Sequence, residues 1–100
     1  MSWATHYIAK LIEGEIVVFR PRGNSMTPII KSKQEVEVAP FAEDEHPFKG
    51  QVVLCKVGGK QFLHKVTAIK GDQYQISNNH GHVNGWTKRE NIYGYVSRIG

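Results

Sequence analysis

Hydrophobic and polar residues alternate along most of the chain, with the period of two that is typical of half-buried β-strands. The clearest alternation flanks Gly58-Gly59, a pair that predicts a hairpin turn because glycine adopts the positive φ angles which a two-residue turn requires. In the first predicted strand, Ile16 and Val18 share one face. Residues 77–85 are polar and are predicted as a loop. The predicted strands cover residues 15–20, 35–38, 51–57, 61–69, 74–76 and 92–99.

The N-terminal segment follows a helical period instead. Its apolar residues recur at spacings of three and four, which predicts one short helix over residues 3–13. Ser2 is a suitable cap at the start of this helix, and Gly14 is a suitable end. The apolar residues at helical spacing are Trp3, Tyr7, Ile8, Leu11 and Ile12.

These elements predict a mainly β fold in a single domain over residues 1–100. Strands at intervals of roughly ten residues, separated by Gly and Pro, favour one sheet folded on itself into a partly open, barrel-like structure. We expect the helix within residues 1–14 to pack on a β core formed by residues 15–99. A chain of 100 residues is long enough for one such core.

Composition and charge exclude a disulfide-stabilised fold and a membrane-spanning protein, and they bear on the kind of partner. The net charge is +4, and residues 46–100 carry the excess, with eight Lys or Arg against two acids. These cations are scattered, so a nucleic-acid partner is less favoured than a peptide or protein substrate. One cysteine excludes an intrachain disulfide, and no apolar run reaches the roughly 18 residues of a membrane span. Because no signal-like segment is visible, we expect a cytoplasmic protein.

One turn contains a candidate nucleophile. The strand ends at Arg20, the backbone turns at Gly23, and Ser25 follows between Pro21 and Pro28. A serine nucleophile needs a rigid backbone, an exposed hydroxyl and free amide N–H groups that bind an oxyanion. The alternative is an ordinary turn serine.

A nucleophilic serine also needs a base, and His64 is the candidate. Alternation places His64 on the same strand face as Phe62 and Val66, where partial burial would keep the imidazole neutral near pH 7. The alternative is a core histidine bonded to a backbone carbonyl. Lys65 is the rival base, on the opposite face of the strand.

Two further sets of residues are candidates for a metal site and for a nucleic-acid surface. Cys55, His64, His80 and His82 match no zinc-binding spacing, so we expect no metal and no cofactor. An aromatic and basic set near the C-terminus is the candidate nucleic-acid surface, although aromatic residues at a strand start more often belong to a core. That set is Trp86, Lys88, Arg89, Tyr93, Tyr95 and Arg98.

The residues around Ser25 resemble a known motif. Gly23-Asn24-Ser25-Met26-Thr27-Pro28 is similar to the Gly-x-Ser-Met-x-Pro box of the signal-peptidase and LexA-like serine peptidase clan. Leu63-His64-Lys65-Val66 resembles the His-Arg-Val segment that carries the base in eukaryotic and archaeal signal peptidases. The other segments in the family's order, within residues 15–99, are Val36-Glu37-Val38, Lys49-Gly50-Gln51-Val52-Val53-Leu54, Ser77-Asn78-Asn79 and Tyr93-Gly94-Tyr95-Val96.

This resemblance implies a compact LexA-like or signal-peptidase-like fold and a bacterial or phage source. It also implies Ser25 as the nucleophile and His64 as the general base. Asn24 and Met26 would then lie beside the bound substrate. The expected protein is a minimal domain without a membrane anchor or a DNA-binding domain.

The sequence departs from the family at the third catalytic group. Ser77-Asn78-Asn79 resembles the family's Gly-Asp-Asn box. The His-type signal peptidases have an Asp shortly after that box, whereas Val83-Asn84-Gly85 contains no acid. Asn78 and Asn84 are therefore the candidates for orienting the imidazole, although an Asn does not stabilise its cation as a carboxylate does. Lys33-Gln34 also stands where the family often has Gly-Asp. The leading hypothesis is a weak or partner-dependent Ser/His serine peptidase; the alternative is a catalytically degraded module that binds peptide, protein or nucleic acid.

Overall fold

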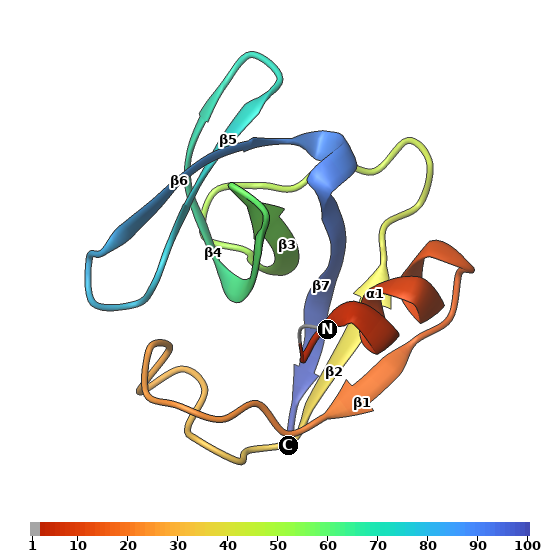
Figure 1. The fold of residues 1–100 in the computed structure, drawn as a ribbon, viewed down its shortest axis with the longest axis vertical. Coiled ribbons are helices and arrows are strands. Elements are labelled where there is room, and N and C mark those ends of the chain that lie inside the picture. The colour runs from red at the N-terminus through yellow and green to blue at the C-terminus, as the bar shows by residue number, and fades with distance from the viewer. Residues whose placement is uncertain (1–2) are drawn as a thin grey trace.

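Antiparallel pairing joins seven strands into one open sheet, with a short helix at the N-terminal end (Figure 1). The computed structural model describes residues 3–100. The strands run in the order β1-β2-β7-β3-β4-β5-β6, so β1 and β6 are the two edges. The elements are α1 (Thr5–Ile12), β1 (Val17–Phe19), β2 (Val36–Pro40), β3 (Val52–Val57), β4 (Lys60–Lys70), β5 (Gln73–Ser77), β6 (Val83–Lys88), the 3-10 turn η1 (Arg89–Asn91) and β7 (Ile92–Ile99).

The sheet curls so strongly that its central strands are buried on both faces. On β3, Leu54 packs into one hydrophobic cluster, with α1, β1 and β2, whereas Val53 and Cys55 pack into a second cluster, with β4 and β5. Because alternate residues of a strand point to opposite faces, β3 separates the two clusters. The curl also brings β6 back towards β3, where the Thr87 hydroxyl donates to the Lys56 carbonyl at 2.8 Å.

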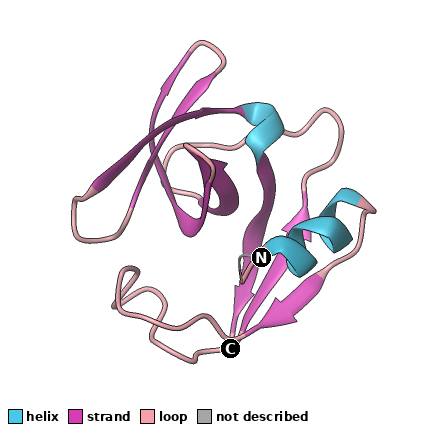
Figure 2. Cartoon of the chain, in the orientation of Figure 1, coloured by secondary structure: helices cyan, strands magenta, loops and turns pink. Residues whose placement is uncertain are grey.

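Helix α1 covers the cluster formed by β1 and β2 (Figure 2). It is shorter than the predicted residues 3–13, and its N-cap is Ala4 without a side-chain cap; the predicted cap Ser2 lies outside the described residues. Gly14 follows the helix with φ +87°, the left-handed conformation that glycine favours at a helix end. The predicted apolar face was wrong at Ile12, which is 70% exposed because it points away from the sheet.

The strand prediction was wrong at the β6 edge of the sheet. Residues 83–85 do not belong to a loop, because Val83–Lys88 forms β6 and pairs with β5. In β1 the buried residues are Val17 and Phe19, so Ile16 and Val18 share the exposed face. Strand β1 is three residues long, so Val17 and Phe19 are its two side chains that pack in the core.

Strand β7 carries a glycine where α1 approaches the sheet most closely. A Cβ atom built at Gly94 would lie 2.7 Å from the Ala39 carbonyl oxygen and 3.0 Å from Leu11 Cδ2. Only glycine therefore fits between the helix and the neighbouring strand β2. Within residues 3–100, no helix has the length and hydrophobicity needed to cross a membrane.

Candidate active site

Ser25 lies in the loop between β1 and β2, and we call residues 23–28 the Ser25 loop. Met26, directly after the serine, is 4% exposed, and Ile30 is 3% exposed; both belong to the cluster under α1. The Ile30 amide donates to the Met26 carbonyl at 2.9 Å. These two apolar side chains anchor the loop in the core and leave the Ser25 hydroxyl at the surface.

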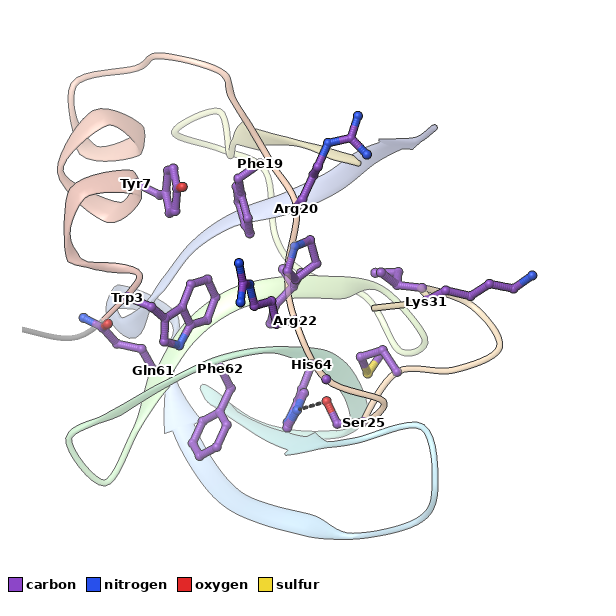
Figure 3. A pocket seen from close by; sticks show the side chains of 15 residues that line it. Trp3, Tyr7, Phe19, Arg20, Arg22, Ser25, Lys31, Gln61, Phe62 and His64 are labelled. Carbon is purple, nitrogen blue, oxygen red and sulfur yellow. Dashed lines mark hydrogen bonds between the residues drawn. The ribbon is translucent and has the colours of Figure 1, made fainter. Parts of the chain in front are cut away.

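The structure places Ser25 beside His64, although the two residues are 39 positions apart. The Ser25 Oγ and His64 Nε2 atoms are 3.1 Å apart (Figure 3). His64 lies on β4 and pairs with Val53 of β3, and the pairing of β4 with β5 begins at the next residue, Lys65. This distance is within the hydrogen-bonding range that a serine and its general base require.

The second ring nitrogen of His64 contacts Asn84. His64 Nδ1 lies 2.6 Å from Asn84 Oδ1. The pairing of β5 with β6 skips one residue here, because Ile76 pairs with Gly85 and Ser77 pairs with Val83. Asn84 is thus the extra residue of a β-bulge, a feature that redirects a side chain out of regular alternation. The bulge aims this amide at the imidazole.

The surroundings of His64 favour its neutral form. Burial lowers the pKa of His64 below its ordinary value of 6.5, the hydrogen bond with Asn84 opposes this shift, and the charge of His82 adds to it. The Phe62 ring stacks on the imidazole with the ring centroids 5.0 Å apart. A neutral imidazole that donates from Nδ1–H to Asn84 presents the lone pair of Nε2 to Ser25.

Asn78 has no hydrogen bond with His64 among the described residues, because its side chain binds the backbone of its own loop. Its side-chain oxygen accepts the amide N–H groups of His80 and His82 at 2.8 and 2.9 Å. Asn78 therefore closes the loop of residues 78–82, and Asn84 is the residue that orients the imidazole.

The loop of residues 78–82 also holds the Ser25 loop from outside. The Asn79 amide donates to the Ser25 carbonyl at 2.8 Å, and its side-chain nitrogen donates to the Thr27 carbonyl at 2.9 Å. His80 Nε2 lies 2.8 Å from the Asn24 carbonyl oxygen. Sequence reasoning missed the supporting role of His80, and no local pattern signals it, because the partner lies 56 residues away.

The rival base Lys65 is engaged elsewhere. Its Nζ atom donates to Asn79 Oδ1 at 2.9 Å. Through Asn79, Lys65 supports the backbone of the Ser25 loop.

Ser25 and His64 open into a pocket with a volume of about 510 Å³. Met26 lines this pocket, whereas Asn24 is not among its lining residues. The predicted position beside the substrate therefore fits Met26, which faces the space next to the serine. It does not fit Asn24, which lies outside this pocket.

The Ser25 loop also contains two backbone amide N–H groups, those of Ser25 and Met26, that are free to bind a ligand. Among residues 3–100, no hydrogen bond engages either group. Unpaired amides next to a nucleophile are the usual donors to an oxyanion.

Two other sets of residues were alternatives to the Ser25 site. The part of the chain that the structure describes holds no group of three or more His, Cys, Asp or Glu side chains placed to bind a metal. Cys55 is buried, and burial raises its pKa to about 12. In the aromatic and basic set, Arg89 stacks on Phe41 and Arg98 pairs with Glu37.

Comparison with family models, with curated proteins and with solved structures found no match.

Proposed function

We propose that this protein is a serine peptidase in which Ser25 is the nucleophile, His64 the general base and Asn84 the group that orients the base. The observation that carries the proposal is the hydrogen-bonded series Ser25–His64–Asn84, with distances of 3.1 and 2.6 Å. Three elements far apart in the sequence supply these side chains. A nucleophile, a base and an orienting group in series are the recurring geometry of serine hydrolases.

The reaction follows from this geometry. Ser25 Oγ attacks the carbonyl carbon of a peptide bond while its proton passes to His64 Nε2. The resulting imidazolium gives that proton to the leaving amine nitrogen, which departs and leaves an acyl group on Ser25. Water, deprotonated by the same imidazole, then attacks the acyl carbon, and the imidazolium returns the proton to Ser25 Oγ as the ester bond breaks and the acid product leaves. The amide N–H groups of Ser25 and Met26 supply the donors that the negative oxygen needs.

The third group distinguishes this site from a Ser-His-Asp triad. Asn84 holds the ring orientation and favours the tautomer with a proton on Nδ1, but its amide carries no charge that stabilises the imidazolium. We therefore expect slow or partner-dependent turnover.

The Ser25 box and the order of the later segments support a relationship to the signal-peptidase and LexA-like clan. We propose that the open sheet is a minimal form of that fold. An extended peptide would pair with an exposed backbone segment beside the pocket and place its side chains near Met26.

A serine-directed fluorophosphonate tests the proposal without knowledge of the substrate. We expect the wild-type protein to gain one adduct, located on Ser25 by peptide mass spectrometry. His64→Ala should slow labelling strongly, because the serine loses its base. Ser97→Ala is the matched control, since the Ser97 hydroxyl bonds only to Glu37 at the surface, and it should label like the wild type.

A folded wild-type protein that never labels would reject the peptidase proposal. The remaining description would then be a binding module on a peptidase-like fold, with peptide, protein or nucleic acid as its ligand. Retention on immobilised DNA that weakens with salt would identify the last of these ligands.

A further inference from the structure

The pocket beside Ser25 has an aromatic wall on the side away from the serine. Tyr7 stacks on Phe19 with the ring centroids 4.3 Å apart, and Trp3 packs against Phe19 at 5.8 Å. All three residues line the pocket, and Trp3 is half exposed. Aromatic rings in this arrangement offer a large apolar surface to an entering side chain.

The same pocket contains cations and no anion. Its charged lining residues are Arg20, Arg22 and Lys31, and no Asp or Glu lines it. Arg20 is already engaged, by the Lys33 carbonyl at 3.1 Å and by Glu35 at 3.4 Å. Arg22 has no hydrogen bond or ion pair with any residue of the described range 3–100.

Of the three cations, Arg22 lies nearest in orientation to the aromatic wall and is therefore best placed to bind a ligand in the pocket. Figure 3 shows the Arg22 side chain extending towards Trp3, whereas Arg20 and Lys31 point outwards, away from the aromatic wall. A guanidinium binds a carboxylate through two parallel hydrogen bonds, so an unpaired arginine that lines a pocket without anions is suited to bind a carboxylate.

We propose that this pocket selects peptides that place a carboxylate on Arg22 and a large apolar side chain against Trp3, Tyr7 and Phe19. This inference rests on the proposed peptidase function and names the substrate class of that site. The carboxylate has two chemical sources, an acidic side chain within the peptide or the free C-terminus. The first makes the protein an endopeptidase with an acidic preference, and the second makes it a carboxypeptidase.

Binding of fluorescently labelled peptides to the Ser25→Ala variant tests the proposal without turnover. Three Phe-containing peptides separate the sources: one with Glu and an amidated C-terminus, one with Gln and a free C-terminus, and one with Gln and an amidated C-terminus. We expect at least one carboxylate peptide to bind about 10- to 100-fold more tightly than the neutral peptide, the range for a hydrogen bond to a charged group.

The variants assign that preference to Arg22. Arg22→Gln should abolish the advantage of the carboxylate, and Arg22→Glu should instead favour a peptide with Lys in place of Glu. Arg20→Gln is the matched control, and it should retain the preference. Trp3→Ala should weaken binding of the Phe peptide but not of the same peptide with Ala.

Equal binding of neutral and carboxylate peptides, or equal loss in the Arg22 and Arg20 variants, would overturn the inference. The two proposals fail separately. Selective binding without fluorophosphonate labelling of Ser25 rejects the peptidase, whereas labelling without carboxylate selectivity rejects only the role of Arg22.

Discussion

His64 is useful as a base only while it is neutral, and its surroundings extend the pH range over which it is neutral. Burial lowers the pKa of His64 below 6.5. We expect hydrolysis or labelling to rise with pH, to reach half of its maximum below pH 6.5 and to be constant near pH 7. Initial rates between about pH 4.5 and about pH 10.5 provide the measurement.

The control for this profile is Lys65→Met, which keeps the apolar stem of the side chain. Because Lys65 contacts Asn79 rather than Ser25, the variant should lower the rate only a few-fold and leave the midpoint in place. A midpoint well above pH 8 in the wild type that disappears in the Lys65 variant would mean that lysine is the base.

We expect Asn84 to limit the rate of the proposed reaction, because its amide is neutral. Asn84→Asp places a carboxylate next to His64 Nδ1, which should raise the pKa of His64 and stabilise the imidazolium formed during attack. The reverse change in a complete triad costs about 10⁴-fold, so we expect a gain of at least about 10-fold in the labelling rate at pH 7. The acidic limb of the pH profile should move to higher pH.

Asn78→Asp is the matched control, since Asn78 binds the loop of residues 78–82 and not the imidazole. Gly85 is unsuitable for the same experiment, because its φ of +141° disfavours any other residue and a Cβ there would lie 3.0 Å from Val57. A folded Asn84→Asp variant that is no faster than wild type would contradict the orienting role of Asn84.

At the scale of elements, the connection between β1 and β2 contains a strained lysine. Lys33 has φ +66°, a left-handed conformation that costs an L-residue about 1–2 kcal/mol. Lys33→Gly removes this strain but adds chain entropy worth about 0.4–1 kcal/mol to the unfolded state. We expect the free energy of unfolding in urea to rise by about 0.5–1 kcal/mol, the difference between these two effects.

Lys33→Ala separates backbone strain from loss of the lysine side chain, because alanine keeps the strain. It should not be more stable than wild type. Equal stabilisation by alanine and glycine would show that the side chain, and not the backbone, was unfavourable.

The contact between α1 and the sheet depends on the absence of a side chain at Gly94. Gly94→Ala should lower the free energy of unfolding by about 1–3 kcal/mol, because the added methyl group meets the Ala39 carbonyl and Leu11. Ser97→Ala, on the same strand but exposed, should stay within about 0.5 kcal/mol of wild type. Urea unfolding of both variants measures the difference, and a neutral Gly94→Ala would mean that α1 moves freely on the sheet.

The local pattern of hydrophobic and polar residues predicted those strands that pair with a strand nearby in the sequence. The β3–β4 hairpin was predicted correctly because both strands alternate clearly and Gly58-Gly59 specifies the turn. Strand β6 was missed because it lies at the edge of the sheet, contains Gly85 and is interrupted by the bulge at Asn84. Regular alternation is lost at a bulge, so the period-two signal was absent.

The candidate site was predicted in part for the same reason. Ser25 and His64 were identified from a motif, and Asn84 was one of two alternatives that only the register of β5 and β6 separates. The role of Arg22 and of the aromatic wall was not predicted. It depends on how α1, the Ser25 loop and β4 meet, which is a property of tertiary packing and leaves no local periodicity.

At the scale of the whole molecule, the β5–β6 hairpin holds the site together. Its loop binds the Ser25 loop through Asn79 and His80, and its edge strand presents Asn84 to His64. The start of β6 pairs with β5 alone, so this region should open before the central strands do. We expect backbone amides of residues 83–85 to exchange with deuterium faster than those of β3, as measured by mass spectrometry.

Asn79→Ala should increase this exchange and slow labelling of Ser25, because the contact between the two loops is lost. Ser97→Ala, an exposed position on β7, serves as the control. Exchange at residues 83–85 as slow as in β3 would contradict the opening of the hairpin as a separate unit.

The position of Asn84 on an edge strand has a thermal consequence. We expect a local opening equilibrium of the hairpin, with a smaller enthalpy than global melting, to set the fraction of molecules that have an assembled site. As temperature rises, an Arrhenius plot of the labelling rate should bend downwards while the circular dichroism of the sheet is still unchanged. Function would then be lost at a temperature below the melting point, and it would return immediately on cooling, because the core never unfolded.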